Sequence, residues 1–404
     1  MSPFDRPLAA SLIRPLDQQP VLTVVVPTFQ RPVEMALAVS SIADQVDASL
    51  EGKVEVIISD NASGPDTAAV LARLAETYPF ISYYIHAQNE GGDYQIFSAP
   101  HRARGRWTWV FGDDDYLGPG GLKPIVALLE TEQPGFLTLN RQVWNKSLDQ
   151  CVTPSKHDLP DVRFGSFLEL LRLFGFDQLS FLTSQVYLTE AARGVDTELY
   201  FTSHCRYCQL AYYLEACHDL PAYYLSQPYV WHRWDQGAGQ VHAANFRHLA
   251  TLHPVLVQQA ADRVGIQDPD LFENIGGRRS LVGPEQRRIT FTDNILENLW
   301  RSVALGTEIP DYEWERMAPA IRTWSPERMS QLQMVREVYA KVWAAFQHFE
   351  TLVHEHKTRT PAVGNAFTPA EISMIQQSEA AILSLQSNIN DARKMAFDMA
   401  AGFS

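Results

Sequence analysis

Three consecutive aspartates, Asp113, Asp114 and Asp115, lie in the stretch VFGDDDYLGP, between an apolar run and a Gly-Pro turn. Adjacent carboxylates repel one another and do not stabilise an apolar core, so they require positive charge nearby. Clustered hard oxygen ligands suit Mg²⁺ or Mn²⁺, and Mg²⁺ usually takes one or two protein carboxylates, with water and substrate phosphates as its other ligands. The stretch therefore indicates a divalent-cation site for a diphosphate-bearing substrate. The alternative interpretation is an acidic turn that precedes a helix near Pro119.

Short apolar runs alternate with helix-like segments over residues 22–139, which is the pattern of βαβ units. The runs are rich in β-branched and aromatic residues, as expected for strands that are buried on both faces. The predicted strands are residues 22–26, 54–59, 81–85, 107–111 and 135–139. The predicted helices between them are residues 32–46, 65–78 and 121–130. The fold class is therefore α/β with a mainly parallel central sheet.

Polar residues follow each of the first four predicted strands. They are Pro27, Thr28 and Arg31, then Asp60 and Asn61, then Asn89, Gly91 and Gly92, and finally the three aspartates. Ligands of such sheets bind at the carboxyl ends of the strands. A single polar loop is unremarkable, but four in succession predict a ligand site at this edge of the sheet.

The segments VVVPTFQRP, IISDNAS, NEGG and RARGRWTWVFGDDDYLGP, in this order and spacing, resemble the signature segments of glycosyltransferase family 2. The resemblance covers about residues 20–135 well and weakens towards about residue 235. It implies the GT-A fold, a nucleotide-binding α/β domain, in an enzyme of the bacterial surface-glycan type. It also implies a metal-dependent, inverting transfer of sugar from a nucleotide-sugar, with UDP-sugar favoured, to a hydroxyl of a glycan, lipid-linked or protein acceptor.

The same resemblance implies roles for individual residues. The nucleotide-binding positions would be Pro27, Thr28, Arg31, Asp60, Asn61, Asn89, Gly91, Gly92, Arg104, Asp113 and Arg233. Asp60 would accept a hydrogen bond from the uracil ring, and Arg233 would neutralise phosphate charge.

The Mn²⁺ or Mg²⁺ ligands implied by the resemblance would be Asp114, Asp115 and His232. The acidic motif can be aligned with the family motif in two ways. Alignment on Pro119 makes Asp114 the best ligand and places Asp113 near the ribose, whereas a literal Asp-x-Asp frame uses Asp113 and Asp115.

The catalytic base is the point at which the sequence departs from the family pattern. Inverting members commonly carry a Glu-Asp pair at a helix start, and Ser203-His204 stands there in this chain. A histidine near neutral pKa can take a proton from a hydroxyl, so His204 is the predicted base and Asp177 its rival. A helix-capping histidine, in an inactive or unusual family member, is the alternative. Trp231 and Trp234, near His232, are expected to stack on a sugar ring.

The composition of the chain limits the classes of partner and of cellular location that are compatible with it. The net charge of -14 argues against a nucleic-acid partner and against simple attraction to anionic lipid. No run of 18 apolar residues and no basic-then-apolar leader is present, so a cytoplasmic location is expected, alternatively peripheral at the inner face of the plasma membrane. Four cysteines are too few for a disulfide scaffold. The CxxC at residues 205–208 permits a zinc site, but a second CxxC is missing, and a buried helix face is the favoured interpretation.

The domain organisation follows from these patterns. Residues 1–20 are expected to be an N-terminal extension, and residues 21–240 a GT-A domain with a nucleotide half (21–135) and an acceptor half (136–240). Residues 241–404 are expected to be helical, with a helix hairpin over 325–400. Two amphipathic stripes predict homo-oligomerisation through these helices. Peripheral membrane contact through the basic patch Arg278, Arg279, Arg287 and Arg288 is the runner-up. A second function class, a non-catalytic sugar-nucleotide binder or assembly scaffold, stays open.

Overall fold

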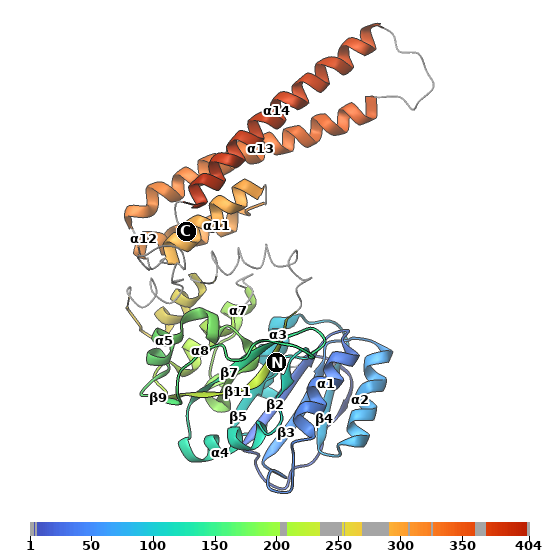
Figure 1. The fold of residues 1–404 in the computed structure, drawn as a ribbon, viewed down its shortest axis with the longest axis vertical. Coiled ribbons are helices and arrows are strands. Elements are labelled where there is room, and N and C mark those ends of the chain that lie inside the picture. Colours follow the sequence, from blue (N-terminus) through green and yellow to red (C-terminus); the bar gives the residue numbers. More distant parts are fainter. Residues whose placement is uncertain are drawn as a thin grey trace. The chain divides into compact units, whose positions relative to one another are not determined.

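The chain forms two structural units, and a computed structural model describes most of each. The described residues are Phe4, 6–202, 208–234, His253, 255–268, 291–305, 308–324, 326–359 and 369–401. The first unit comprises residues 1–243 and 256–267, and the second comprises residues 244–255 and 268–404. In Figure 1 the first unit carries the sheet, and the helices coloured orange to red belong to the second.

The described part of the first unit is built on a mixed eleven-stranded sheet (Figure 1). The strand order is β1-β4-β3-β2-β5-β10-β7-β11-β6, with β8 paired to β7 and β9 paired to β11. The strands are β1 Leu8–Leu12, β2 Leu22–Thr28, β3 Val54–Asp60, β4 Ile81–His86, β5 Trp107–Val110, β6 Tyr116–Leu117, β7 Phe136–Asn145, β8 Cys151–Thr153, β9 Val162–Phe164, β10 Gln185–Leu188 and β11 Ala222–Trp234.

Parallel pairing is confined to two blocks of this sheet. The strands β4, β3, β2 and β5 are mutually parallel, and so are β7 and β11. Between the blocks, β10 runs antiparallel to both β5 and β7. The predicted α/β class with a central sheet is confirmed, and all five predicted strands are present. The antiparallel β10 is the main departure from the expected mainly parallel arrangement.

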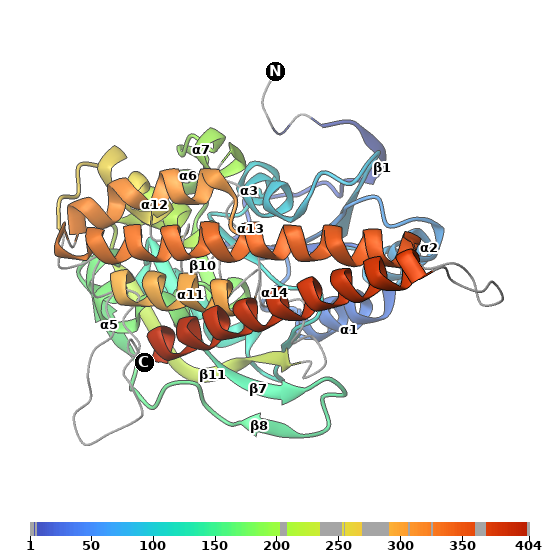
Figure 2. The ribbon, with the colours of Figure 1, turned by 90° about the horizontal axis from the view of Figure 1, so that it is seen from above.

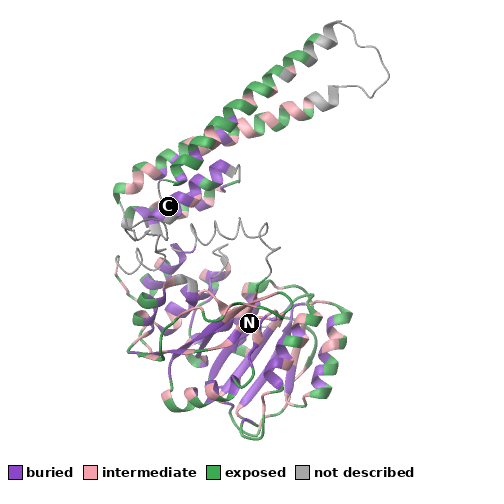
Figure 3. Cartoon of the chain, in the orientation of Figure 1, coloured by how far each residue is buried: buried purple, intermediate pink, exposed green. Residues whose placement is uncertain are grey.

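The apolar runs form strands because both faces of the sheet are covered. Every residue of β3 is buried, and Figure 3 shows the central strands in purple. One core cluster joins β2, β3 and β5 to α1 (Pro32–Ala43), α2 (Pro65–Thr77) and α4 (Leu122–Glu132). Proline at the start of α1 and of α2 suits the first helical turn, where its missing N–H has no partner to lose.

The remaining helices of the first unit contact one another and the strands in a second group. They are α3 (Gly92–Arg102), α5 (Phe167–Leu179), α6 (Thr189–Arg193), α7 (Glu198–Thr202) and α8 (Gln209–Cys217). The sequence pattern does not predict α3, because the helix begins at a glycine pair and contains Pro100. A kink at Gly175, whose φ is 62°, interrupts α5.

The predicted N-terminal extension contributes an edge strand to the sheet. β1 pairs antiparallel with β4, and Leu8 lies opposite His86 in the register. Tyr94 in α3 donates a hydrogen bond to the Phe4 carbonyl at 2.8 Å. The chain before residue 20 therefore covers an edge that would otherwise present unpaired backbone groups.

The described part of the second unit is helical. Its helices are α11 (Phe291–Leu305), α12 (Asp311–Trp324), α13 (Met329–Arg359) and α14 (Pro369–Ala401). α13 and α14 form a helix hairpin, and both contact α11 (Figure 2). Trp300 and Trp314 are buried in this unit. None of the helices in the described residues combines the length and the apolarity that a membrane crossing requires. The predicted basic patch at residues 278–288 lies outside the described residues.

The burial of His86 makes stability depend on pH. Burial lowers the pKa of His86 to about 4, and the Arg102 charge acts in the same direction, while Glu90 opposes it. The unfolded chain binds a proton near pH 6.5, so between pH 6.5 and 4 it holds more protons than the folded chain. The free energy of unfolding therefore decreases as the pH falls through this window.

Replacing His86 with phenylalanine should remove this pH dependence. The unfolding free energy of the wild type relative to His86→Phe should fall by about 2 kcal/mol between pH 7.5 and 4.5. Chemical denaturation of both proteins across this range measures the difference. Parallel pH profiles would show that His86 titrates normally in the folded chain.

Candidate active site

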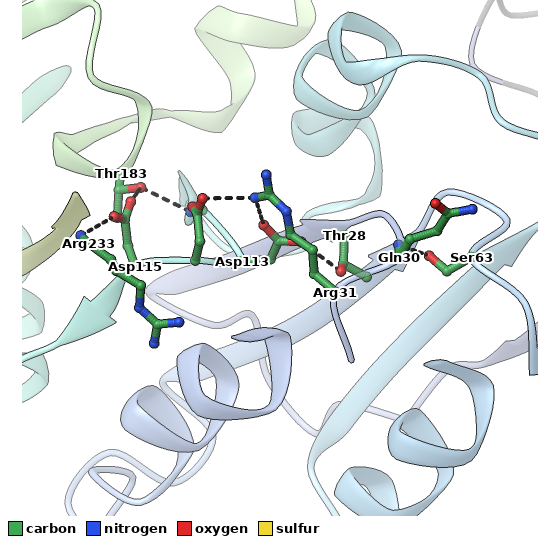
Figure 4. A network of polar contacts seen from close by, with 10 residues as sticks. Thr28, Gln30, Arg31, Ser63, Asp113, Asp115, Thr183 and Arg233 are labelled. Atoms are coloured by element: carbon green, nitrogen blue, oxygen red, sulfur yellow. Dashed lines mark hydrogen bonds and ion pairs between the residues drawn. The ribbon is translucent and has the colours of Figure 1, made fainter. Parts of the chain in front are cut away.

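The carboxyl ends of β2, β3, β4 and β5 bring the predicted polar residues to one edge of the sheet. Thr28 lies opposite Asp60 in the register of β2 and β3, and Asp60 lies opposite Ile85 of β4. The triple aspartate follows β5, which pairs with β2 on its other side. The expected convergence of these loops is therefore present, and Figure 4 shows part of the resulting network.

Asp60 and Asn61 anchor one side of this edge. Asp60 is buried and accepts hydrogen bonds from the Ser63 hydroxyl and, at 3.2 Å, from the Ser63 backbone N–H. Burial raises the pKa of Asp60, and these hydrogen bonds oppose the shift. The Ser63 hydroxyl also accepts a hydrogen bond from the Gln30 backbone N–H at 2.8 Å (Figure 4). The loops after β2 and β3 are thus tied together.

Asn61 links the loops after β3 and β4. Its side-chain amide donates to Asn89 Oδ1 at 2.8 Å, and its Oδ1 accepts the Glu90 backbone N–H at 2.8 Å. Asn89 Oδ1 also accepts the Gly91 N–H at 2.9 Å. Gly91 has a φ of 88°, which favours glycine, and Gly92 begins α3. A Cβ on either glycine would meet nothing within 4 Å, so the space above them is open.

Asp113 faces the loop after β2. Its carboxylate accepts the Thr28 hydroxyl at 2.8 Å and Arg31 Nη1 at 3.0 Å (Figure 4). Burial raises the pKa of Asp113, and the Arg31 charge opposes the shift. Asp113 therefore stabilises the loop that carries Thr28 and Arg31.

Asp115 faces the opposite direction. It is buried, accepts the Thr183 hydroxyl, and accepts the Arg233 backbone N–H at 3.3 Å. Figure 4 shows that the backbone nitrogen of Arg233 faces this carboxylate. Burial raises the pKa of Asp115 to about 8, and the Asp114 charge adds to the shift. Asp115 thus joins the loop after β5 to the η1 turn (Leu182–Ser184) and to β11.

Asp114 is the accessible member of the triplet. Its side chain is 45% exposed, and Asp114 Oδ2 lies 2.8 Å from Arg31 Nη1. Asp113 and Asp115 are both enclosed by protein donors, so Asp114 is the carboxylate of the three that can best reach a ligand. The geometry favours the frame in which Asp114 is the metal ligand over the literal Asp-x-Asp frame.

Gly112 leaves room for two of these carboxylates. Its N–H donates to Thr183 Oγ1 at 3.0 Å. A Cβ at Gly112 would lie 2.9 Å from Asp115 Oδ2 and 3.3 Å from Asp114 Oδ1. Asp114 and Asp115 therefore approach the same stretch of backbone, which requires glycine here.

The donor set fits a hard divalent cation held by few protein ligands. Among the described residues, no three His, Cys, Asp or Glu side chains are arranged to hold a metal ion. Mg²⁺ needs only one or two carboxylates when phosphates and water complete its shell. Asp114, with Asp115 next to it, meets that requirement. The ring of His232, the third predicted ligand, packs on Phe181 with centroids 4.4 Å apart.

Arg104 is not brought to this edge. It precedes β5, so it lies where the parallel strands begin, and its Nε donates to Glu55 Oε1 at 2.6 Å. Glu55 is buried and also accepts the Thr23 hydroxyl at 2.6 Å. The prediction that Arg104 borders the nucleotide is therefore wrong, because a buried carboxylate at the opposite edge holds its guanidinium.

The two predicted catalytic bases are not described in full. His204 lies outside the described residues, and so does Cys205 of the CxxC. Asp177 lies in α5, two residues after the kink at Gly175, and its side chain is outside the described part. Their roles stay predictions.

The tryptophans of β11 have different surroundings. Trp231 stacks on Tyr116 and on Trp144, with ring centroids 5.1 Å and 4.4 Å apart, from strands on opposite sides of β11. Its ring faces are therefore covered, and the expectation that Trp231 stacks on a sugar is wrong. Trp234 is 45% exposed and keeps that expectation open.

Sequence reasoning missed two residues of this region, Arg141 and Thr183. Arg141 is buried in β7, donates to Gln178 Oε1 at 2.5 Å, and lies 4.4 Å over the Phe181 ring. It also lowers the pKa of Asp115, although less than burial raises it. The sequence feature that could have identified Arg141 is the presence of an arginine inside the apolar strand FLTLNRQVW. Thr183 offered none, because it lies far from the aspartates in sequence.

Comparison with known proteins identifies the region that carries this site. Residues 23–190 match the model of Glycosyl transferase family 2. This region is therefore similar to glycosyltransferase family 2. The match contains Thr28, Asp60 and the three aspartates, so the family's motif region and the polar edge of the sheet coincide.

Two curated relatives are bacterial glycosyltransferases. Abequosyltransferase RfbV of Salmonella typhimurium is 28% identical over 118 residues, which are 29% of this chain and 35% of that protein. The GalNAc(5)-diNAcBac-PP-undecaprenol beta-1,3-glucosyltransferase of Campylobacter jejuni is 27% identical over 168 residues, which are 38% of this chain and 52% of that protein. The chain thus spans about a third to a half of the length of these relatives.

A solved structure of similar extent is that of S. aureus TarS 1-349. It covers 79% of this chain and 91% of its own, with 14% identity and a TM-score of 0.49.

Removing the Thr183 hydroxyl should destabilise the first unit. Thr183→Val keeps the shape but deletes the donor to buried Asp115 and the acceptor for Gly112, which should lower the unfolding free energy by about 1–3 kcal/mol. Thr183→Ser keeps the hydroxyl and is the matched control. Chemical denaturation measures both variants against the wild type. Equal stability of the valine and serine variants would contradict the assigned hydrogen bonds.

Proposed function

We propose that this protein transfers a sugar from a nucleotide-sugar donor, with UDP-sugar favoured, to an acceptor hydroxyl. The supporting observation is the edge of the sheet within residues 23–190, where an accessible carboxylate, Asp114, and the anchored Asp60–Asn61 network follow the carboxyl ends of parallel strands. An acidic site for a cation and a polar site for a base at one sheet edge suit a nucleoside diphosphate. The match of residues 23–190 to the family 2 model supports sugar transfer as the reaction.

Asp60 is the residue that we expect to select the base. Its carboxylate is held by Ser63 and can only accept hydrogen bonds when ionised. Uracil offers an N–H donor at N3, whereas N3 of cytosine is an acceptor and would repel the carboxylate. Asn61, Asn89 and Gly91 would line the base and ribose, since their loop is open above the glycine.

The residues after β2 and β11 would hold the rest of the donor. Thr28 and Asp113 form a hydrogen-bonded pair at the position expected for the ribose. Arg31 and Arg233 would meet the diphosphate, because guanidinium groups bind phosphate oxygens in a bidentate manner. Pro27, which is half-buried at the end of β2, shapes the same loop.

Asp114, with Asp115 next to it, would hold Mg²⁺ or Mn²⁺, and His232 is the further ligand implied by the family resemblance. A divalent cation bound there would supply the positive charge that stabilises the leaving diphosphate. Asp113, tied to Thr28 and Arg31, would orient the ribose.

The chemistry that we propose is a single displacement with inversion at the sugar carbon. A protein base takes the proton of the acceptor hydroxyl, which attacks from the face opposite the nucleotide, so no covalent intermediate is required. His204 and Asp177 remain the candidate bases. Positioning and electrostatic stabilisation would supply most of the rate enhancement.

The proposed acceptor is a glycan, on a lipid or a protein carrier. The printed name of the Campylobacter relative describes transfer to a glycan linked through PP to undecaprenol. A lipid-linked acceptor of that kind would place this protein at the cytoplasmic side of the plasma membrane, with peripheral contact. Trp234, which is half-exposed and contacts His232, would stack on an acceptor sugar.

Substitution of Asp114 tests the enzyme against the non-catalytic alternative. Asp114→Asn should lower the turnover number at least about 100-fold, because an electrostatic stabiliser of the leaving group is lost. The fold should persist, since this side chain is half-exposed. Product formation is measured with UDP-, GDP-, CDP- and dTDP-sugars, with and without Mn²⁺.

The matched control for Asp114→Asn is Glu130→Gln in α4, which also removes one carboxylate but pairs with Lys53 at the opposite edge. It should keep full activity. A wild type that binds a nucleotide-sugar without transferring it to any glycan acceptor would favour the sugar-nucleotide binder or scaffold.

The hairpin of α13 and α14 supports a second part of the proposal, homo-oligomerisation. Among the described side chains of residues 343–355 and 373–388, none is buried (Figure 3). Apolar residues, including Leu383 at 66% exposed, lie along these helices. A second copy of the hairpin would bury them in a four-helix bundle. These stretches contain Glu350, Glu355 and Glu379 and no lysine or arginine, which disfavours anionic lipid as the partner.

Charges at exposed apolar positions of α14 should separate the copies. Leu383→Lys combined with Phe397→Lys, both at exposed positions, should convert a dimer to a monomer without unfolding the first unit. Sedimentation of the full chain measures the mass, and Asn388→Lys, at an exposed polar position of the same helix, is the control. Flotation with anionic vesicles tests the membrane alternative. A monomeric wild type would refute this part of the proposal.

A further inference from the structure

A single nitrogen of Arg31 bridges two carboxylates of the acidic triplet. Arg31 Nη1 lies 3.0 Å from Asp113 Oδ1 and 2.8 Å from Asp114 Oδ2 (Figure 4). The backbone of Arg31 is fixed at the start of α1, where its carbonyl accepts the Met35 N–H at 2.9 Å. Its side chain is 52% exposed, so the guanidinium is free to change rotamer while its backbone stays in place.

The bridge balances charge that the fold would otherwise leave unpaired. Burial lowers the pKa of Arg31, but the Asp113 and Asp114 charges outweigh this effect and raise it. In return, Arg31 opposes the effect of burial on the pKa of Asp113. Among the described residues, Arg31 is therefore the counter-ion that contacts both acids.

Arg31 and a divalent cation compete for the same oxygen. Mg²⁺ binds carboxylate oxygen at about 2.0–2.1 Å, so an ion on Asp114 Oδ2 would lie close to a guanidinium that contacts this atom at 2.8 Å. Two positive groups at that separation repel each other in a partly buried site. This repulsion favours departure of the guanidinium from Asp114 Oδ2 when an ion binds to that oxygen.

A nucleoside diphosphate offers Arg31 another partner. Phosphate oxygens accept bidentate hydrogen bonds from guanidinium, and the diphosphate would lie at the same sheet edge. We propose that Arg31 is a counter-ion switch, which blocks the cation site until a nucleoside diphosphate draws its guanidinium away from Asp114. This inference rests on the proposed donor and cation sites. It deepens them, because it makes Arg31 the link between the two ligands.

The switch has a thermodynamic consequence. If the nucleotide releases Asp114 for the cation, then the cation must tighten nucleotide binding by the same factor. Part of this coupling comes from direct contact between the ion and phosphate, and that part does not need Arg31. The part that depends on Arg31 is the difference between the wild type and a variant without the guanidinium.

Mn²⁺ binding to the full-length protein measures the switch directly. Electron paramagnetic resonance detects free Mn²⁺ during titration, with and without UDP, and requires no turnover. Without UDP, Arg31→Gln should bind Mn²⁺ about tenfold more tightly than the wild type, and its coupling to UDP should be about tenfold smaller. Arg31→Lys, which keeps the charge, should retain the weak nucleotide-free binding of the wild type.

Controls separate the switch from general changes of charge and fold. Arg163→Gln removes an exposed arginine that pairs with Glu132, and it should leave Mn²⁺ binding unchanged. A denaturation curve for Arg31→Gln checks that the site is folded. If Arg31→Gln binds Mn²⁺ no more tightly than the wild type without UDP, the switch is refuted while the cation site stands. If the wild type binds no Mn²⁺ even with UDP, the cation site fails, and the switch with it.

Discussion

This site depends on one constraint: the negative charge of three adjacent carboxylates has to be compensated by nearby donors or cations. Buried carboxylates such as Asp113 and Asp115 need hydrogen-bond donors or positive charge. The fold solves this with separate segments: Thr28 and Arg31 from the loop after β2 serve Asp113, and Thr183 and Arg233 serve Asp115. Each acid thereby joins the loop after β5 to a different part of the chain.

That arrangement ties the two halves of the first unit together. β10 lies between β5 and β7, and the η1 turn before it supplies the hydroxyl for Asp115. β11 runs parallel to β7 and supplies the backbone N–H of Arg233. The acidic loop is therefore built by segments on either side of it in sequence. A displacement of β10 or β11 would uncover a buried carboxylate, so the sheet and the site stabilise one another.

The sequence predicted the features that depend on local pattern. Apolar runs located β2, β3, β4 and β5 because strands buried on both faces are continuously apolar, and the polar residues that follow them reached one edge because parallel strands end together. What the sequence could not predict depends on distant partners. The pairing of Arg104 with Glu55, the stacking of Trp231 between Tyr116 and Trp144, and the contact of Thr183 with Asp115 each join residues far apart in the chain.

The contacts of the triplet also explain why the chain has three aspartates, although two carboxylates would suffice to bind a cation. Successive side chains in a turn point in different directions, so the three cannot converge on one ion. Asp113 and Asp115 use their oxygens to hold the turn against the loops on either side, and this leaves Asp114 between them at the surface. The outer acids fix the backbone of the turn, so Asp114 is held at the surface in a defined position. A single exposed aspartate on a mobile loop would lack this advantage.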